Sequence, residues 1–156
     1  MEVNYMIPKF RAWDSEANIM IYSDHRTRKL YDVYYGFEMN GKGELECRWE
    51  GDFTESQVLD GGILDNIMQS TGLKDKNGVE IFEGDIVVGQ QHLTTDSSTP
   101  FEIKGLVRYS KRNTMFYLDE KSFGHDKFMH LLGSSIYQYE VIGNIYENPE
   151  LLEVEG

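Results

Sequence analysis

The chain has 156 residues, of which 40% are hydrophobic and 13% aromatic, so it is long enough to fold as one domain around a buried core. It holds no run of about 18 apolar residues and no signal-peptide pattern at its start, which excludes a membrane-spanning helix and indicates a soluble, cytoplasmic protein. The 15 basic and 27 acidic side chains give a net charge of −12, which disfavours non-specific binding to nucleic acid.

The first two expected strands, residues 10–13 and 19–22, flank a turn rich in Asp, Ser and Asn, which predicts an N-terminal hairpin. A second hairpin is indicated by the apolar side chains at every second position of residues 35–39 and 45–49. Between these strands, Asn40-Gly41 supplies residues that tolerate positive φ. The alternation directs one set of side chains toward the core: Tyr35, Phe37, Met39, Leu45, Cys47 and Trp49.

Residues 54–69 are open to two interpretations, helix and strand. Thr54 to Gln57 could begin a short helix, which Gly61-Gly62 would interrupt. The apolar residues that follow are too few to define a period, so the pattern does not decide between them.

Residues 71–156 are expected to form a small barrel of short strands, with Asn77-Gly78 at the tip of its first turn. The polar stretch 89–100 is predicted to be a mobile loop. Short helices are expected at residues 126–132 and after Asn148-Pro149, an N-cap followed by a proline. The strands rich in β-branched and aromatic residues are 79–82, 86–88, 101–109, 115–118 and 137–146.

The predicted fold class is therefore mainly β. We expect a single domain over residues 1–156, with hairpins in residues 1–70 and a small SH3-like barrel in residues 71–156. One or two short helices accompany the strands.

Few side chains suggest catalysis. Glu83 and Asp85 flank Gly84 and fit either a cation or acid–base site or a turn in which Asp85 caps backbone amides, and the turn is favoured. His125 and His130, at a spacing of five, do not share a helical face, so no histidine metal site is expected. Cys47 lies in mid-strand and is typical of an inert buried thiol. The sequence predicts neither a cofactor nor a metal.

Two clusters of basic residues interrupt the acidic sequence. One is residues 25–29. The negative net charge of the chain favours the interpretation that both clusters are solvent-exposed segments. The second cluster is the candidate nucleic-acid-binding strip, formed by Lys104, Arg108, Lys111 and Arg112.

Ten tyrosines are a high number for this length. Two groups of them fit a binding face and ordinary strand packing equally well, because tyrosine suits both. The groups are Tyr31, Tyr34 and Tyr35, and Tyr137, Tyr139 and Tyr146.

Three blocks resemble the YopX family of phage and prophage proteins: KFRAWD (residues 9–14), MQSTGLKDKNGVEIFEGDIV (68–87) and VIGNIYENPELL (141–152). The resemblance implies a small, largely β protein encoded by phages or prophages, mostly of Gram-positive bacteria. It implies no activity and no catalytic or ligand residue. The block residues themselves have structural interpretations: turns at Asn77-Gly78 and Gly84, packing at Trp13 and Ile86, and capping at Asn148-Pro149.

The leading hypothesis is a non-enzymatic accessory protein that binds a protein partner or a second copy of itself. The second is a nucleic-acid-binding module that uses the basic strip. The third is a metal-assisted hydrolase that uses Glu83, Asp85 or His125.

Overall fold

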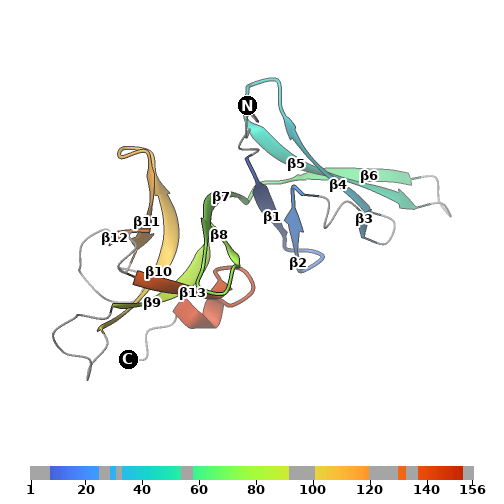
Figure 1. Cartoon of the computed structure of the whole chain (residues 1–156). Helices are drawn as coiled ribbons and strands as arrows, with labels where there is room; N and C mark the ends of the chain where they lie inside the picture. The colour runs from blue at the N-terminus through green and yellow to red at the C-terminus, as the bar shows by residue number, and fades with distance from the viewer. Residues whose placement is uncertain are drawn as a thin grey trace, which may run out of the picture. The chain divides into compact units, whose positions relative to one another are not determined.

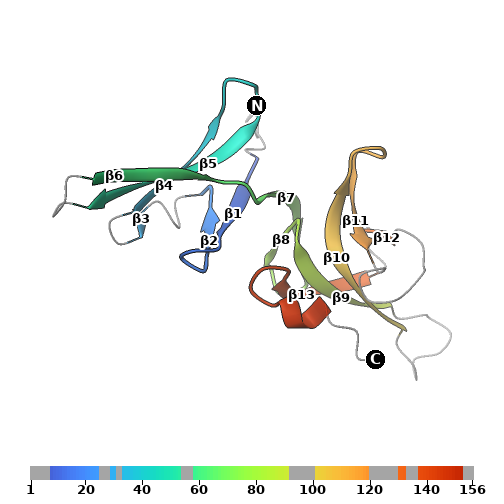
Figure 2. The same cartoon turned by 180° about the vertical axis from the view of Figure 1, so that it is seen from behind.

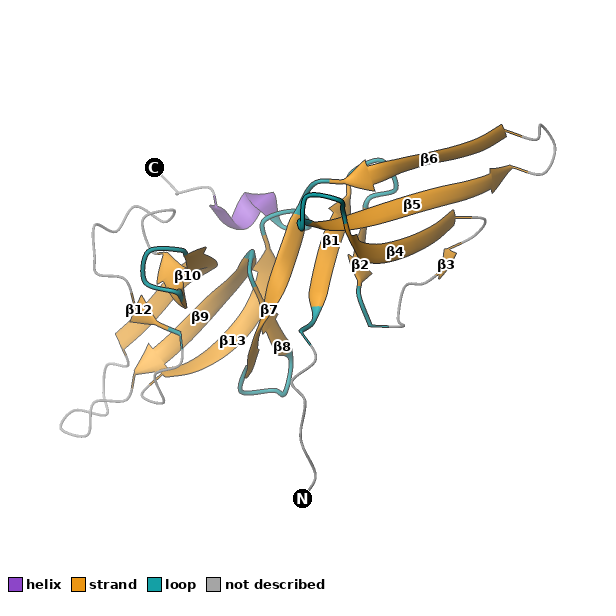
Figure 3. Cartoon of the chain, turned by 90° about the horizontal axis from the view of Figure 1, so that it is seen from above, coloured by secondary structure: helices purple, strands orange, loops and turns teal. Residues whose placement is uncertain are grey.

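The computed structural model describes residues 8–24, 29–30, 33–53, 58–91, 101–119, 130–132 and 137–152. Strands dominate these residues and a single 3-10 turn, Pro149–Leu152 (η3), is the only helix among them, which confirms the mainly β fold (Figure 3). None of the described segments is a helix of the length and apolarity that crossing a membrane requires. The chain divides into two compact units, Met1–Gln69 and Ser70–Gly156.

The first unit contains two antiparallel groups of strands. The hairpin β1–β2 pairs with the first three residues of β7, and a separate sheet has the order β3-β4-β5-β6 (Figure 1). Its elements are β1 (Phe10–Asp14), β2 (Ile19–Tyr22), β3 (Lys29–Leu30), β4 (Val33–Met39), β5 (Leu45–Phe53), β6 (Val58–Leu64) and the start of β7 (Ile67–Lys74).

Residues 58–64 and 67–69 are strands, so the helix interpretation of these residues is wrong; residues 54–57 lie outside the described part of the chain. Seven residues of β6 pair with β5. Gly62 lies inside this strand because the Trp49 ring covers it, and a Cβ at Gly62 would lie 2.6 Å from Trp49 Nε1. The glycine therefore accommodates a neighbouring ring rather than ending a helix.

The core of the first unit lies on one face of the β3–β6 sheet. The predicted alternation holds for Tyr35, Phe37 and Cys47, but it is wrong for Met39, which is 63% exposed at the end of β4. Ala12, Ile21 and Cys47 are fully buried, and Tyr35 and Phe37 pack against them. The turn after β1 is closed by Asp14, whose Oδ1 accepts hydrogen bonds from the backbone N–H groups of residues 16 and 17.

The β4–β5 turn differs from the expectation. The positive φ, 79°, occurs at Gly43 rather than at Asn40-Gly41. Asn40 contributes through its side chain instead, because its Oδ1 accepts hydrogen bonds from the N–H groups of Lys42 and Glu44. The connection is thus an Asx-type turn rather than a two-residue tight turn.

The second unit contains a five-stranded antiparallel sheet of order β12-β11-β10-β9-β13, curled into a half-barrel (Figures 1 and 2). The end of β7 pairs with β8 beside it. The elements are β8 (Glu80–Phe82), β9 (Asp85–Gln91), β10 (Phe101–Ser110), β11 (Met115–Asp119), β12 (His130–Leu131) and β13 (Tyr137–Asn144).

Two expectations for this unit need correction. Residues 89–91 belong to β9, so the expected loop begins no earlier than residue 92; residues 92–100 lie outside the described residues. His130 and Leu131 pair with β11 as a short strand, so the helix expected over residues 126–132 is wrong there. The remainder of that segment, residues 126–129, is also outside the described chain.

The inner face of the curled sheet is the core of the second unit. It buries Ile81, Val87, Ile103, Val107, Leu118, Leu132 and Tyr139. Two glycines make this packing possible: a Cβ at Gly105 would lie 2.4 Å from Leu118 Cγ, and one at Gly89 would lie 2.8 Å from Tyr139 Cε1. Glycine is required at both positions because these large side chains lie directly on the backbone.

Candidate functional site

The middle family block forms a turn that is hydrogen-bonded to β13. Asp75 is buried, and its Oδ1 accepts hydrogen bonds from the N–H groups of Asn77 (2.8 Å) and Val79 (2.9 Å). Its Oδ2 accepts one from Val141 N–H at 3.0 Å. Gly78 has φ 81°, as the predicted turn requires. Asp75 is therefore structural, although no pattern in the sequence singled it out.

The pKa of Asp75 follows from this geometry. Desolvation by burial raises it, but the three backbone hydrogen bonds and the positive charge of Lys76 lower it, and the net result is a pKa below the ordinary value. The carboxylate is thus held ionised by the turn and the strand that it joins.

The acid pair is also structural at Asp85. This carboxyl group is 2% exposed, and its Oδ2 accepts a 2.8 Å hydrogen bond from Phe82 N–H, which confirms the capping interpretation. Gly84 between the two acids has φ 86° and donates its N–H to Val107 O. Among the described residues, no group of three or more His, Cys, Asp or Glu side chains is arranged to hold a metal ion.

The final family block forms the end of the half-barrel. Asn144 Oδ1 accepts hydrogen bonds from Tyr146 N–H (3.0 Å) and Glu147 N–H (2.8 Å), which closes the turn after β13. Asn148 precedes Pro149, the first residue of η3 as expected, and its Oδ1 accepts from Asn144 N–H at 3.3 Å. The buried Trp13 and Ile86 complete the structural roles expected of the three blocks.

The two basic clusters differ in how much of them the structure describes. Residues 25–28 lie outside the described residues. Lys104 and Arg108 lie on the outer face of β10, and Lys111 and Arg112 lie in the exposed β10–β11 turn. Arg108 Nε is 2.8 Å from Asp119 Oδ2, so a carboxylate already offsets its charge. The structure thus separates the strip into an ion-paired strand and a turn.

The tyrosine groups are divided between core and surface. Tyr35 packs in the first core and Tyr139 is 6% exposed in the second, so strand packing is the correct interpretation for both. Tyr146 is half-buried. Tyr34, on the opposite face of β4 from Tyr35, is 49% exposed. Tyr31 and the Tyr137 side chain lie outside the described structure.

Tyr35 and Cys47 belong to the first core, and the pKa of each side chain is raised there. The Tyr35 hydroxyl donates a 3.0 Å hydrogen bond to Asp14 Oδ2. Burial, followed by this bond to a carboxylate, raises the pKa of Tyr35 well above its ordinary value. Burial and the Asp14 charge raise the pKa of the Cys47 thiol to about 12. The buried position predicted for Cys47 is confirmed.

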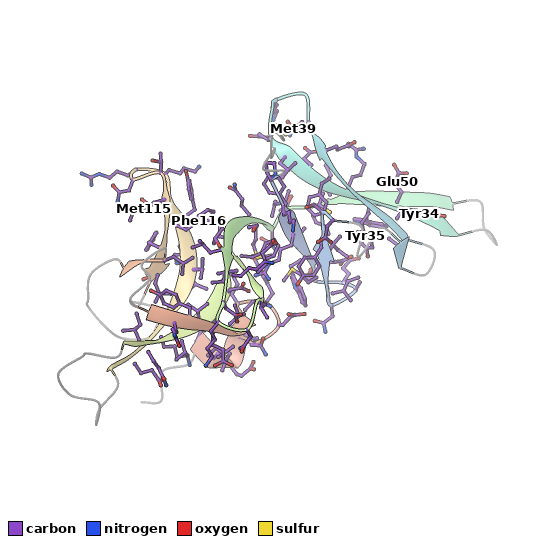
Figure 4. All side chains as sticks on the ribbon, viewed as in Figure 1. Tyr34, Tyr35, Met39, Glu50, Met115 and Phe116 are labelled. Carbon is purple, nitrogen blue, oxygen red and sulfur yellow. The ribbon has the colours of Figure 1, made fainter. Side chains whose placement is uncertain are left out.

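The outer face of the β4–β5–β6 sheet carries an exposed surface that we call the acidic face. Tyr34 lies directly opposite Glu50 on the neighbouring strand (Figure 4), and Ile63 lies opposite Arg48. Tyr34 and Ile63 are 49% and 48% exposed. The acidic face comprises Tyr34, Glu38, Glu46, Arg48, Glu50 and Ile63.

The charges of the acidic face are unevenly compensated. Arg48 Nε lies 2.7 Å from Glu38 Oε1, and Arg48 Nη2 lies 3.9 Å from Glu46 Oε2. Within the described part of the chain, Glu50 forms no ion pair. Two carboxylates thus pair with one guanidinium and a third carries no paired cation among the described residues, so these four side chains have a net negative charge. The alternation in residues 44–49 predicted where Glu46 and Arg48 point, but the open assignment of residues 54–69 concealed Ile63.

Comparison with known proteins places this mainly β chain in a family. The family model for YopX protein matches residues 9–153, and the chain belongs to the YopX family. Among solved structures, the chain is similar to protein EF1440 from Enterococcus faecalis, with 31% identity, coverage of 96% of this chain and 100% of that chain, and a TM-score of 0.48. No curated protein matches the sequence.

Proposed function

We propose that this YopX family member is a non-enzymatic accessory protein, of phage or prophage origin, that binds a protein partner in the cytoplasm of its bacterial host. The observation that carries the proposal is the acidic face. It is the uncovered side of a sheet whose other side is a packed core, and it combines half-exposed apolar side chains with excess negative charge.

The composition of the acidic face suits a basic protein segment. Protein interfaces combine a few large apolar anchors with charged residues around them, and tyrosine is enriched among the anchors. Tyr34 and Ile63 are such anchors, and the Glu50 carboxylate beside Tyr34 is positioned to meet a Lys or Arg side chain. Gly36, on the same face as Tyr34, has nothing within 4 Å of where its Cβ would lie, so a partner can approach the backbone there.

The structural role of Asp85 supports the non-enzymatic part of the proposal. A buried carboxyl group that caps Phe82 N–H is occupied by the fold and is poorly placed for acid–base work. His125, the third residue of the hydrolase hypothesis, lies outside the described residues. Assay for hydrolysis with added divalent metal tests this part, and metal-dependent turnover would contradict it.

The binding proposal is tested by affinity capture from a lysate of the bacterial host with three immobilised proteins. These are the natural chain, Glu50→Lys on the acidic face, and Glu16→Lys in the exposed β1–β2 turn as a control with the same charge change. We expect one stoichiometric protein on the natural chain and on the control, and its loss from Glu50→Lys. Absence of a stoichiometric partner, or equal capture by Glu50→Lys, would overturn the proposal.

Self-association is examined in the same preparation. Light scattering coupled to size-exclusion chromatography gives the mass in solution. A dimer that dissociates on Glu50→Lys would make the partner a second copy of this chain, whereas a monomer leaves a different protein as the partner.

A further inference from the structure

The β10–β11 hairpin is rich in basic residues, although the protein as a whole is acidic. Residues 103–118 contain four of the 15 basic side chains and no acidic residue. The carboxylates nearest to this segment along the chain are Glu102 before it and Asp119 and Glu120 after it. A protein with a net charge of −12 therefore concentrates positive charge on one hairpin, which makes this hairpin the complement of an anionic ligand.

The turn, rather than the strand, is the accessible part of this charge. Arg108 is ion-paired with Asp119 at 2.8 Å, and Lys104 is half-buried on β10. Lys111 and Arg112, by contrast, are exposed, and neither makes an ion pair within the described residues. Two cations are thus free to contact a ligand at the tip of the hairpin.

An aromatic pair lies immediately beside these cations. Tyr109 and Phe116 face each other across the hairpin, with ring centroids 5.1 Å apart and planes inclined at 61° (Figure 4 labels Phe116). Tyr109 is 39% exposed. The edge-to-face contact holds its ring in place, and the exposed part of the ring remains available for stacking.

The hairpin geometry makes this tip reachable. β9 pairs with β10 only as far as Leu106, the Gly84 N–H bonds to Val107 O, and β12 pairs with β11 at Tyr117 and Leu118. Residues 109–110 and 115–116 therefore pair only with each other. The end of the hairpin is therefore a two-stranded arm, which projects beyond the rest of its sheet (Figure 1). A ligand can contact the turn cations and the Tyr109 ring together.

We propose that the tip of the β10–β11 hairpin binds single-stranded nucleic acid, with Lys111 and Arg112 contacting phosphates and Tyr109 stacking on a base. The combination of backbone-contacting cations and an exposed aromatic ring is the general basis of single-strand recognition. An acidic peptide would engage the same cations but offers no flat ring for Tyr109. A duplex keeps its bases stacked internally, so it too leaves the tyrosine unused.

The test is fluorescence anisotropy with a labelled oligothymidylate of about 15 nucleotides and the full chain. Binding is expected at low salt, and two phosphate contacts predict a loss of affinity of roughly sevenfold between about 50 and 200 mM salt. The double variant Lys111→Ala/Arg112→Ala should weaken binding and flatten this salt dependence. Tyr109→Leu should weaken binding about tenfold and leave the salt dependence unchanged.

A matched control separates the site from the overall charge. Lys42→Ala/Lys74→Ala removes two exposed cations elsewhere and gives the same net charge as the tip variant. This control should bind like the natural chain, and circular dichroism should show all variants folded.

Several outcomes would overturn the proposal. They are no binding of oligothymidylate at low salt, equal weakening in the tip and control double variants, and no effect of Tyr109→Leu. Tighter binding of a polyglutamate peptide than of oligothymidylate would assign the tip to an acidic protein instead.

Discussion

The buried carboxylate of Asp75 accepts a 3.0 Å hydrogen bond from the backbone N–H of Val141, which lies 66 positions later in the chain. The other carboxylate oxygen closes the turn before β8 through Asn77 and Val79. One side chain thus connects the middle and final family blocks. An acceptor of the middle block thus satisfies a backbone donor of the final block.

Substitution of Asp75 should destabilise the second unit in a pH-dependent manner. Asp75→Ala removes three acceptor contacts and should lower the free energy of unfolding by about 2–4 kcal/mol, and Asp75→Asn, which keeps one amide oxygen, by less. The pKa of Asp75 is lowered in the folded state. The stability that its ionised form contributes is therefore fully present above the ordinary pKa of 3.8 and is lost as the pH falls through the folded-state pKa.

Thermal melts of the natural chain and Asp75→Asn over a range of pH check this prediction. The difference in Tm should be largest near about pH 7 and should shrink as the pH falls below about 4. A difference that is constant with pH would contradict the ionised role of Asp75.

Removal of the Tyr35 hydroxyl should weaken the first unit. Tyr35→Phe deletes the donor to Asp14 Oδ2 and keeps the ring in the core, so the free energy of unfolding should fall by about 1–2 kcal/mol. Urea denaturation measures this difference. Tyr34→Phe, on the exposed side of the same strand, is the control and should stay within about 0.5 kcal/mol of the natural chain.

The Cys47 thiol should be unreactive in the folded protein. Cys47 is fully buried and its pKa is raised to about 12, so almost no thiolate exists near about pH 8 and no reagent reaches it. Titration with a disulfide reagent should show no thiol without denaturant and one thiol in guanidinium. Rapid labelling of the native chain would show that the first core opens readily.

Gly105 should not tolerate a side chain. In Gly105→Ala the new Cβ would lie 2.4 Å from Leu118 Cγ, and Leu118 is fully buried, so overpacking should lower the free energy of unfolding by about 1–3 kcal/mol. With Leu118→Ala in the same chain, the loss caused by Gly105→Ala should be smaller, because that substitution removes the Cγ and Cδ atoms that the new Cβ would meet. Gly36→Ala, with nothing within 4 Å, is the space control. Additive effects of Gly105→Ala and Leu118→Ala would contradict the contact.

The fold was largely predictable where one side of a strand is buried. Residues 35–39 and 45–49 alternate because one sheet face packs on Ala12 and Ile21 while the other is exposed. The pattern did not decide residues 58–64, where two glycines resemble a break and the reason for Gly62, the Trp49 ring, comes from another strand. It failed at His130-Leu131, because pairing with β11 defines that strand.

The candidate surfaces were only partly predictable. Charge alone indicated Lys111 and Arg112, but the ion pair between Arg108 and Asp119 depends on the register of β10 and β11, which single-strand patterns do not specify. The tyrosines were ambiguous for a similar reason. Tyr34 and Tyr35 are neighbours in sequence, and only the direction of the core distinguishes an exposed side chain from a buried one.

The strand order of the half-barrel has a consequence for synthesis on the ribosome. β9 pairs with β10 on one side and with β13 on the other, and β13 is the last strand to be made. At typical translation speeds, the 45 residues between the end of β9 and the start of β13 take about 2–10 seconds to add. Throughout that interval the N–H and C=O groups along one edge of β9 lack their β13 partners. This exposed edge can then pair with a strand from another chain.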